Sequence, residues 1–167
     1  MKRALYLAVG LLLLVAGSAR SSEPAVLEFG TMVAVTGPFV GSANAIRGIN
    51  GGGLPWMISE GRGQLKSDGN LEVQVRGLVL FNGPPVPGNL QGTNPIAAFR
   101  AVVSCQTIVG GSPATRNVST DPFPATPDGN AEIEATISLP SPCIAPIVFV
   151  TNGTTPPPGA WFAATGF

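Results

Sequence analysis

The segment NLEVQVRGLVL, residues 70–80, decides the fold class because its side chains alternate between apolar and polar. Successive side chains of an extended strand point to opposite sides, so a period of two gives the strand one apolar and one polar face. We expect a buried face of Leu71, Val73, Val75 and Val79 and a solvent face of Glu72, Gln74 and Arg76. The pattern predicts a half-buried strand.

Two more segments have the same period. In NAEIEATISL, residues 130–139, the apolar side chains from Ala131 to Leu139 are expected to face inward and the acidic ones outward. In PIAAFRAVVSCQTI, residues 95–108, one face carries Phe99, Ala101, Val103 and Cys105. No window has a sustained helical period. Further strands are expected at residues 28–36, 43–49, 54–59, 146–151 and 161–165.

Many short strands separated by turn residues are typical of an all-β sandwich or barrel. We predict one antiparallel β-sandwich domain, Ig-like or jelly-roll-like, over residues 20–167. Its 22 glycines and 17 prolines would mark the turns, since 44% of the residues are apolar. Two long proline-rich segments, residues 82–95 and 110–130, are expected to be loops.

The first 19 residues have the pattern of a secretory signal peptide. Two basic residues follow Met1, an apolar run continues through Ala16, and the small residues Gly17 and Ala19 precede the expected cleavage point. The alternative is a membrane anchor, but a spanning helix needs about 20 apolar residues and this run is shorter. We therefore expect export, cleavage near Arg20, no remaining membrane span, and a secreted or periplasmic location.

The charge balance argues against nucleic acid or anionic lipid as a partner. The chain has nine basic and nine acidic residues, and losing Lys2 and Arg3 with the signal peptide leaves a net charge of −2. That charge is too small to steer the protein toward a polyanion.

The two cysteines, Cys105 and Cys143, are expected to form a disulfide, because an isolated pair in an exported protein is typically bridged. The strand at residues 95–108 points Cys105 inward, and the bridge would join it to the segment before residues 147–151. The chain contains no histidine. This excludes nucleophiles that a histidine activates and zinc sites that contain histidine.

Two glycine-containing segments resemble phosphate-binding motifs, but each lacks a residue that the motif requires. A dinucleotide pattern that starts at Gly51 meets Trp56 where the third glycine is required. In GRGQLKS, residues 61–67, Leu65 stands where a phosphate loop needs glycine. We interpret Gly51–Gly53 as a turn or bulge that leads into a strand, and we expect no cofactor.

The tripeptide Asp-Gly-Asn occurs twice, at residues 68–70 and 128–130, each time before an alternating run. Asp and Asn could supply oxygen ligands to calcium, but neither segment has the further ligands of a calcium loop. Asp-Gly also accommodates positive φ, so both are interpreted as β-turns that lead into strands. No metal site is expected.

Two ligand sites remain as alternatives. Trp56 and Trp161 would stack on sugar rings if they were exposed, although large aromatic residues in strands are usually core. Glu72, Glu132 and Glu134 are expected to share a sheet face, and two carboxyl groups of suitable spacing can hydrolyse a glycoside. An ordinary solvated polar face is the simpler interpretation.

The chain resembles a family of small exported bacterial proteins without an assigned function. The segments that carry the resemblance are GGGLPW, VRGLVL, NPIAAFRAVVSC, DPFPAT, PCIAPIVFVT and AWFAATG. The resemblance implies export and the paired cysteines, and it supplies no catalytic residue, substrate or cofactor.

Taken together, these features predict a non-enzymatic protein with a structural or macromolecular-interaction role at or outside the cell envelope. The expected partner is a protein or a polysaccharide of the envelope. A carbohydrate-binding module that uses Trp56 or Trp161 is the first alternative. A carboxylate-based glycosidase is the second.

Overall fold

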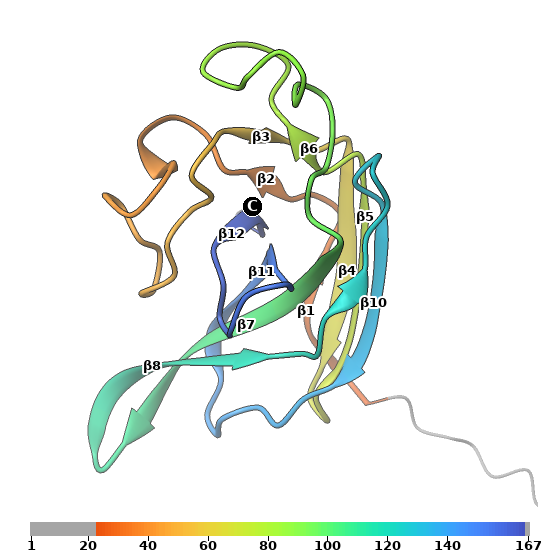
Figure 1. The fold of residues 1–167 in the computed structure, drawn as a ribbon. Helices are drawn as coiled ribbons and strands as arrows, with labels where there is room; N and C mark the ends of the chain where they lie inside the picture. The colour runs from red at the N-terminus through yellow and green to blue at the C-terminus, as the bar shows by residue number, and fades with distance from the viewer. Residues whose placement is uncertain (1–22, 166–167) are drawn as a thin grey trace, which may run out of the picture.

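Two of the alternating segments, residues 70–76 and 131–136, lie side by side in a four-stranded antiparallel sheet of the computed structural model, which describes residues 23–165 (Figure 1). Its strands, in spatial order, are β1 (Ala25–Phe29), β4 (Glu60–Lys66), β5 (Asn70–Arg76) and β10 (Ala131–Thr136). The predicted signal peptide, residues 1–19, lies outside the described residues.

The second sheet has six strands. In spatial order they are β2 (Val33–Ala34), β12 (Trp161–Ala164), β11 (Ile144–Asn152), β7 (Ala98–Val109) and β8 (Ser112–Ser119), and β9 (Phe123–Pro124) also pairs with β7. A short third sheet joins β3 (Trp56–Met57) to β6 (Val79–Leu80), and one turn of 3-10 helix, η1, spans Gly37–Phe39.

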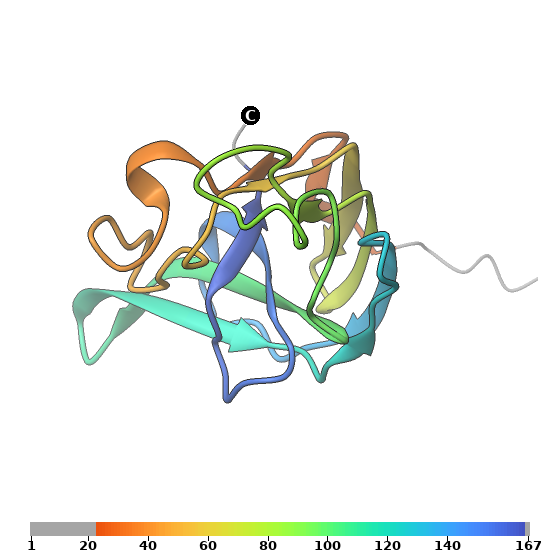
Figure 2. The same ribbon diagram turned by 45° about the horizontal axis from the view of Figure 1, so that its top comes forward.

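The two large sheets pack against each other around one hydrophobic core. Leu71, Val75 and Ile133 are buried on the four-stranded sheet, and Phe99 and Phe149 are buried on the six-stranded sheet, all in a single cluster. In Figures 1 and 2 the four-stranded sheet stands at the right of the molecule, with β7 and β11 beside it. The prediction of an antiparallel β-sandwich is confirmed, and so is the buried face predicted for residues 71–75.

Strand β7 is buried on both faces rather than on one. Cys105 and the other residues predicted to face inward are buried, but Arg100, Val102 and Ser104 on the opposite face are buried too. On that opposite face Arg47 donates a hydrogen bond from Nη1 to the carbonyl oxygen of Ser104 at 2.8 Å. Residues 99–105 of β7 are therefore covered on both faces, and we call β7 the central strand, although its end at Ile108 and Val109 is exposed.

The expectation of one long loop at residues 110–130 is wrong, since β8 occupies residues 112–119 and pairs with β7 along its whole length. The side chains of β8 are exposed or half-buried on both faces. A strand of this kind has no apolar alternation, and periodicity therefore gives no signal for it. Residues 82–95 contain no strand, as expected.

The strand expected at residues 43–49 is also absent. Ile46 and Ile49 instead exchange two backbone hydrogen bonds, of 3.0 and 2.9 Å, across a tight turn formed by Arg47 and Gly48. Both turn residues have positive φ, 50° at Arg47 and 78° at Gly48, which a regular strand does not accommodate. The strand expected at 54–59 is reduced to β3, Trp56–Met57.

The two Asp-Gly-Asn segments form turns, as predicted, and lead into β5 and β10. Gly69 and Gly129 have φ values of 87° and 73°. Each glycine also lies against the end of the other strand: the amide of Ile137 donates to the carbonyl oxygen of Gly69, and the amide of Leu78 donates to that of Gly129, both at 3.0 Å. At each end of the β5–β10 pair, the residues that follow one strand are therefore hydrogen-bonded to the turn that precedes the other.

Candidate functional site

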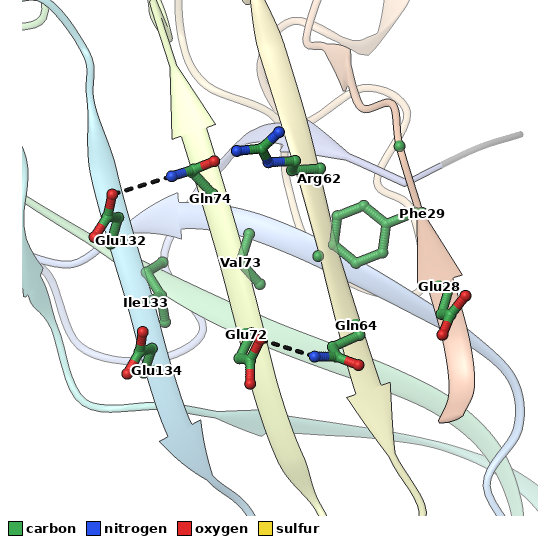
Figure 3. A pocket seen from close by; sticks show the side chains of 12 residues that line it. Glu28, Phe29, Arg62, Gln64, Glu72, Val73, Gln74, Glu132, Ile133 and Glu134 are labelled. Carbon is green, nitrogen blue, oxygen red and sulfur yellow. Dashed lines mark hydrogen bonds between the residues drawn. The ribbon is translucent and has the colours of Figure 1, made fainter. Parts of the chain in front are cut away.

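The solvent face of the four-stranded sheet brings the predicted carboxylates together. Glu72 and Glu134 lie directly opposite each other on β5 and β10, and Glu132 lies one row away, opposite Gln74. Figure 3 shows their side chains projecting from the same face. The depression over this face has a volume of about 650 Å³ and extends across β4 to Glu28 on β1.

Neutral and basic side chains hold two of these carboxylates. Gln64 donates a hydrogen bond to Glu72 at 2.8 Å, and Gln74 donates to Glu132 at 3.0 Å (Figure 3). Arg76 forms an ion pair with Glu132 at 2.7 Å. These hydrogen bonds from Gln74 and Arg76, together with the positive charge of Arg76, lower the pKa of Glu132.

This arrangement supplies negative charge and gives no support to acid–base catalysis. A general acid in glycoside hydrolysis needs a raised pKa, whereas that of Glu132 is lowered. Glu72 and Glu134 are exposed on an open face rather than enclosed in an apolar pocket. The structure brings the three residues to one face, as predicted.

The two tryptophans lie in the core, contrary to the ring-stacking interpretation. Trp56 and Trp161 are each 4% exposed. Trp56 stacks on Phe162 with ring centroids 4.1 Å apart, and Trp161 packs against Phe149 at 6.1 Å. Both indoles are buried, so neither offers a platform for a sugar in this structure.

Gly51 serves close packing rather than phosphate binding. A Cβ atom at Gly51 would lie 1.9 Å from the carbonyl oxygen of Phe39, and one at Gly52 would lie 3.0 Å from the ring of Phe162. Gly51 also forms an isolated bridge with Trp161. The glycines thus let the chain pass between η1 and the aromatic core, in line with the turn or bulge interpretation.

The predicted disulfide between Cys105 and Cys143 is present, with a Cα–Cα distance of 5.0 Å. Cys105 is fully buried on β7, and Cys143 immediately precedes β11. The bridge therefore ties the central strand to the start of its neighbour, as the sequence predicted.

A second candidate surface lies at the end of the β7–β8 hairpin, which extends away from the sandwich in Figures 1 and 2. Ile108 lies opposite Pro113, and Ile144 lies opposite Gln106, so Ile108, Pro113 and Ile144 share one face of the sheet. We call Ile108, Pro113 and Ile144 the hairpin surface. Sequence reasoning missed it because residues 110–130 were expected to be a loop.

The part of the chain that the structure describes contains no helix with the length and hydrophobicity needed to cross a bilayer. Among residues 23–165, no three Cys, Asp or Glu side chains lie close enough to hold a metal ion. Comparisons with models of known protein families, with curated proteins and with solved structures give no match for this chain.

Proposed function

We propose that the protein is exported and acts at or outside the cell envelope as a non-catalytic interaction protein, with another protein as the partner of the hairpin surface. One observation carries this proposal. Ile108 and Ile144 are 56% and 54% exposed, and they lie on the same sheet face, at and beside the projecting hairpin.

Exposed apolar side chains that gather in one place mark interaction sites, whereas scattered ones need no explanation. Branched side chains at the end of a hairpin stand clear of the rest of the molecule and can enter a depression on a partner. The hairpin surface contains no aromatic residue, and rings are the groups that stack on sugars. This composition favours a protein over a polysaccharide.

The disulfide supports export. Disulfides persist in oxidising compartments such as the periplasm and the extracellular space, and they are rare in the cytosol. The bridge between Cys105 and Cys143 fits such a location together with the signal-peptide pattern of residues 1–19.

The test measures binding of the labelled mature protein to envelopes isolated from the cells that produce it. The wild type is compared with a variant of the hairpin surface, Ile108→Ser and Ile144→Ser. The control variant carries Val26→Ser and Phe81→Ser, two side chains that are each 44% exposed elsewhere on the molecule.

We expect saturable binding that weakens about tenfold or more in the hairpin variant, because the central contacts of an interface carry most of its affinity. The control should bind like the wild type. Both variants must first show the wild-type circular dichroism spectrum and unfolding midpoint. Equal binding by all three proteins, or no saturable binding by any, would contradict the proposal.

A further inference from the structure

The outer edge of β10 presents backbone groups that no strand among residues 23–165 pairs. β10 pairs with β5 on one side only. The hydrogen bond from the amide of Ile137 to Gly69 shows that the odd-numbered residues of this segment bond toward β5. In an antiparallel ladder the positions alternate, so Glu134 and Thr136 direct their N–H and C=O groups away from β5.

The edge strands β1, β2 and β8 each have a feature that hinders pairing, and β10 has none of these features. β1 has a register shift between Ala25 and Leu27, and β2 has only two residues. β8 has Pro113 at a position that faces outward, where proline removes a donor. β10 runs through six residues in continuous register, without a bulge or a proline.

A groove lies beside this edge. It has a volume of about 550 Å³ and runs between residues 134–138 and the end of β8 with the residues that follow it, 118–121. No residue of β5 lines it, so the groove is on the unpaired side of β10. Val118 and Phe123 are half-buried there and Ile137 is buried, which gives the groove an apolar wall.

The carboxylate at this edge is not neutralised. Glu134 lies opposite Glu72, and like charges placed directly opposite each other are unfavourable. Glu72 accepts a hydrogen bond from Gln64, but Glu134 makes no hydrogen bond or ion pair with any of residues 23–165. Asp121 lines the same groove. The edge therefore favours a positively charged neighbour.

We propose that the β10 edge binds an extended polypeptide strand in which basic and apolar residues alternate. The added strand would pair with the backbone of Glu134 and Thr136, as in other cases of strand addition. On such a strand, every second side chain would lie beside Glu134 on the solvent face, where a basic group is favoured. The intervening side chains would point toward Val118 and Phe123, where apolar groups are favoured.

This site is separate from the hairpin surface, because Pro113 and Ser119 lie at opposite ends of β8. Envelope binding by the hairpin surface and peptide binding by the β10 edge can therefore succeed or fail independently. The β10 edge adds a second site, with its own ligand chemistry, to the proposed interaction protein.

The probe is an acetylated, amidated peptide in which lysine and valine alternate, titrated into the isotope-labelled mature protein and followed by NMR. We expect saturable shifts confined to residues 118–123 and 134–138. The amides of Glu134 and Thr136 should also exchange more slowly with solvent in the complex. A peptide of the same sequence with N-methylated lysines should not bind, because in an antiparallel ladder the residues opposite Glu134 and Thr136, whose side chains share their face, supply the donors.

The matched variants are Glu134→Lys and Glu28→Lys. Glu28 lies in the same cross-strand row, which runs through Gln64 and Glu72 to Glu134, but it belongs to the edge strand β1. Glu134→Lys should weaken binding about tenfold, as the loss of a close charge pair does, and Glu28→Lys should have little effect. If Glu134→Lys does not fold, a peptide with glutamate in place of lysine tests the same contact on the wild type.

Three results would overturn the proposal. The first is the absence of shifts at millimolar peptide, or equal binding by the N-methylated peptide. The second is equal weakening by Glu134→Lys and Glu28→Lys, which would indicate general electrostatic attraction to the sheet face. The third is a shift of residues 134–138 by soluble polysaccharides but not by the peptide.

Discussion

The side chain of Arg100 donates a hydrogen bond from Nε to the carbonyl oxygen of Thr120 at 2.9 Å, in the interior of the protein. Its Nη1 donates to the carbonyl oxygen of Thr155 at 3.0 Å. Arg100 is 6% exposed and forms no ion pair with a carboxylate among residues 23–165. One buried guanidinium thus joins β7 to the residue after β8 and to the loop after β11.

Replacing Arg100 with methionine should destabilise the protein strongly. The variant Arg100→Met fills much of the same space but leaves the buried carbonyl group of Thr120 without this donor, at a cost of about 1–3 kcal/mol, and also removes the part-buried hydrogen bond to Thr155. The free energy of unfolding in urea measures the loss. The control is Arg116→Met, because Arg116 is exposed on β8. A control as unstable as Arg100→Met would contradict the assignment.

The disulfide should account for a large part of the stability. Cys105 and Cys143 are 38 residues apart, and removing a native bridge from a small exported domain typically costs about 2–5 kcal/mol. The double variant Cys105→Ala, Cys143→Ala should unfold at lower denaturant than the wild type, and reductant should lower only the midpoint of the wild type. Reactive thiols in the unreduced, denatured wild type would show that the bridge is absent.

The turn at Gly69 should not accept a side chain. Positive φ costs a residue with a Cβ atom about 1–2 kcal/mol, and a Cβ at Gly69 would in addition lie 1.9 Å from the carbonyl oxygen of Ile137. Gly92 has a φ of 67° and open space around it. Gly69→Ala should therefore lower the free energy of unfolding clearly more than Gly92→Ala. Equal losses of unfolding free energy in the two variants would mean that the positive φ, and not the close contact with Ile137, sets the cost.

The hydrogen bond from Gln74 to Glu132, together with the ion pair that Glu132 forms with Arg76, should make the stability of the fold depend on pH. The pKa of Glu132 is lowered in the folded protein from an ordinary value of 4.5. Its carboxylate therefore contributes to stability above that pH, and the contribution is lost as the pH falls through the folded-state pKa. The unfolding midpoints of wild type and Glu132→Gln should differ near neutral pH and converge in acid. A difference that persists at low pH would indicate a cause other than this titration.

The two tryptophans should report a buried environment. Trp56 and Trp161 are each 4% exposed, so emission should be blue-shifted and acrylamide should quench it weakly until the protein is unfolded. Soluble polysaccharides should leave the spectrum unchanged. A saturable spectral shift that disappears in a folded Trp56→Phe or Trp161→Phe variant would restore the sugar-binding alternative.

The parts of the fold that the sequence predicts well are those in which one strand face is buried and the other is solvated. Val73 and Ile133 alternate with charged residues for that reason, and their faces are correctly predicted. Periodicity gives no such signal for a strand whose two faces are both exposed or both buried. Strand β8 is exposed on both faces and was missed, whereas β7 is buried on both faces, so only one of its two buried faces was recognised.

The candidate sites also differ in how far the sequence predicts them. The shared face of Glu72, Glu132 and Glu134 follows from the alternation of two strands, and the sequence predicts it. The groove beside Glu134 depends on where the end of β8 lies relative to β10, which is a tertiary relationship between strands of different sheets. The burial of Trp56 against Phe162 likewise joins residues more than a hundred positions apart in the chain.

The reciprocal turns at Gly69 and Gly129 give the β5–β10 pair a cooperative character. Each turn is closed by an amide from the end of the opposite strand, Ile137 in one case and Leu78 in the other. Fraying at either end of the pair therefore releases a turn as well as a strand terminus, and the two strands open as one unit. Turns between strands are usual sites of proteolytic cleavage. Since a protease needs a locally unfolded segment, we expect both of these turns to be cleaved slowly.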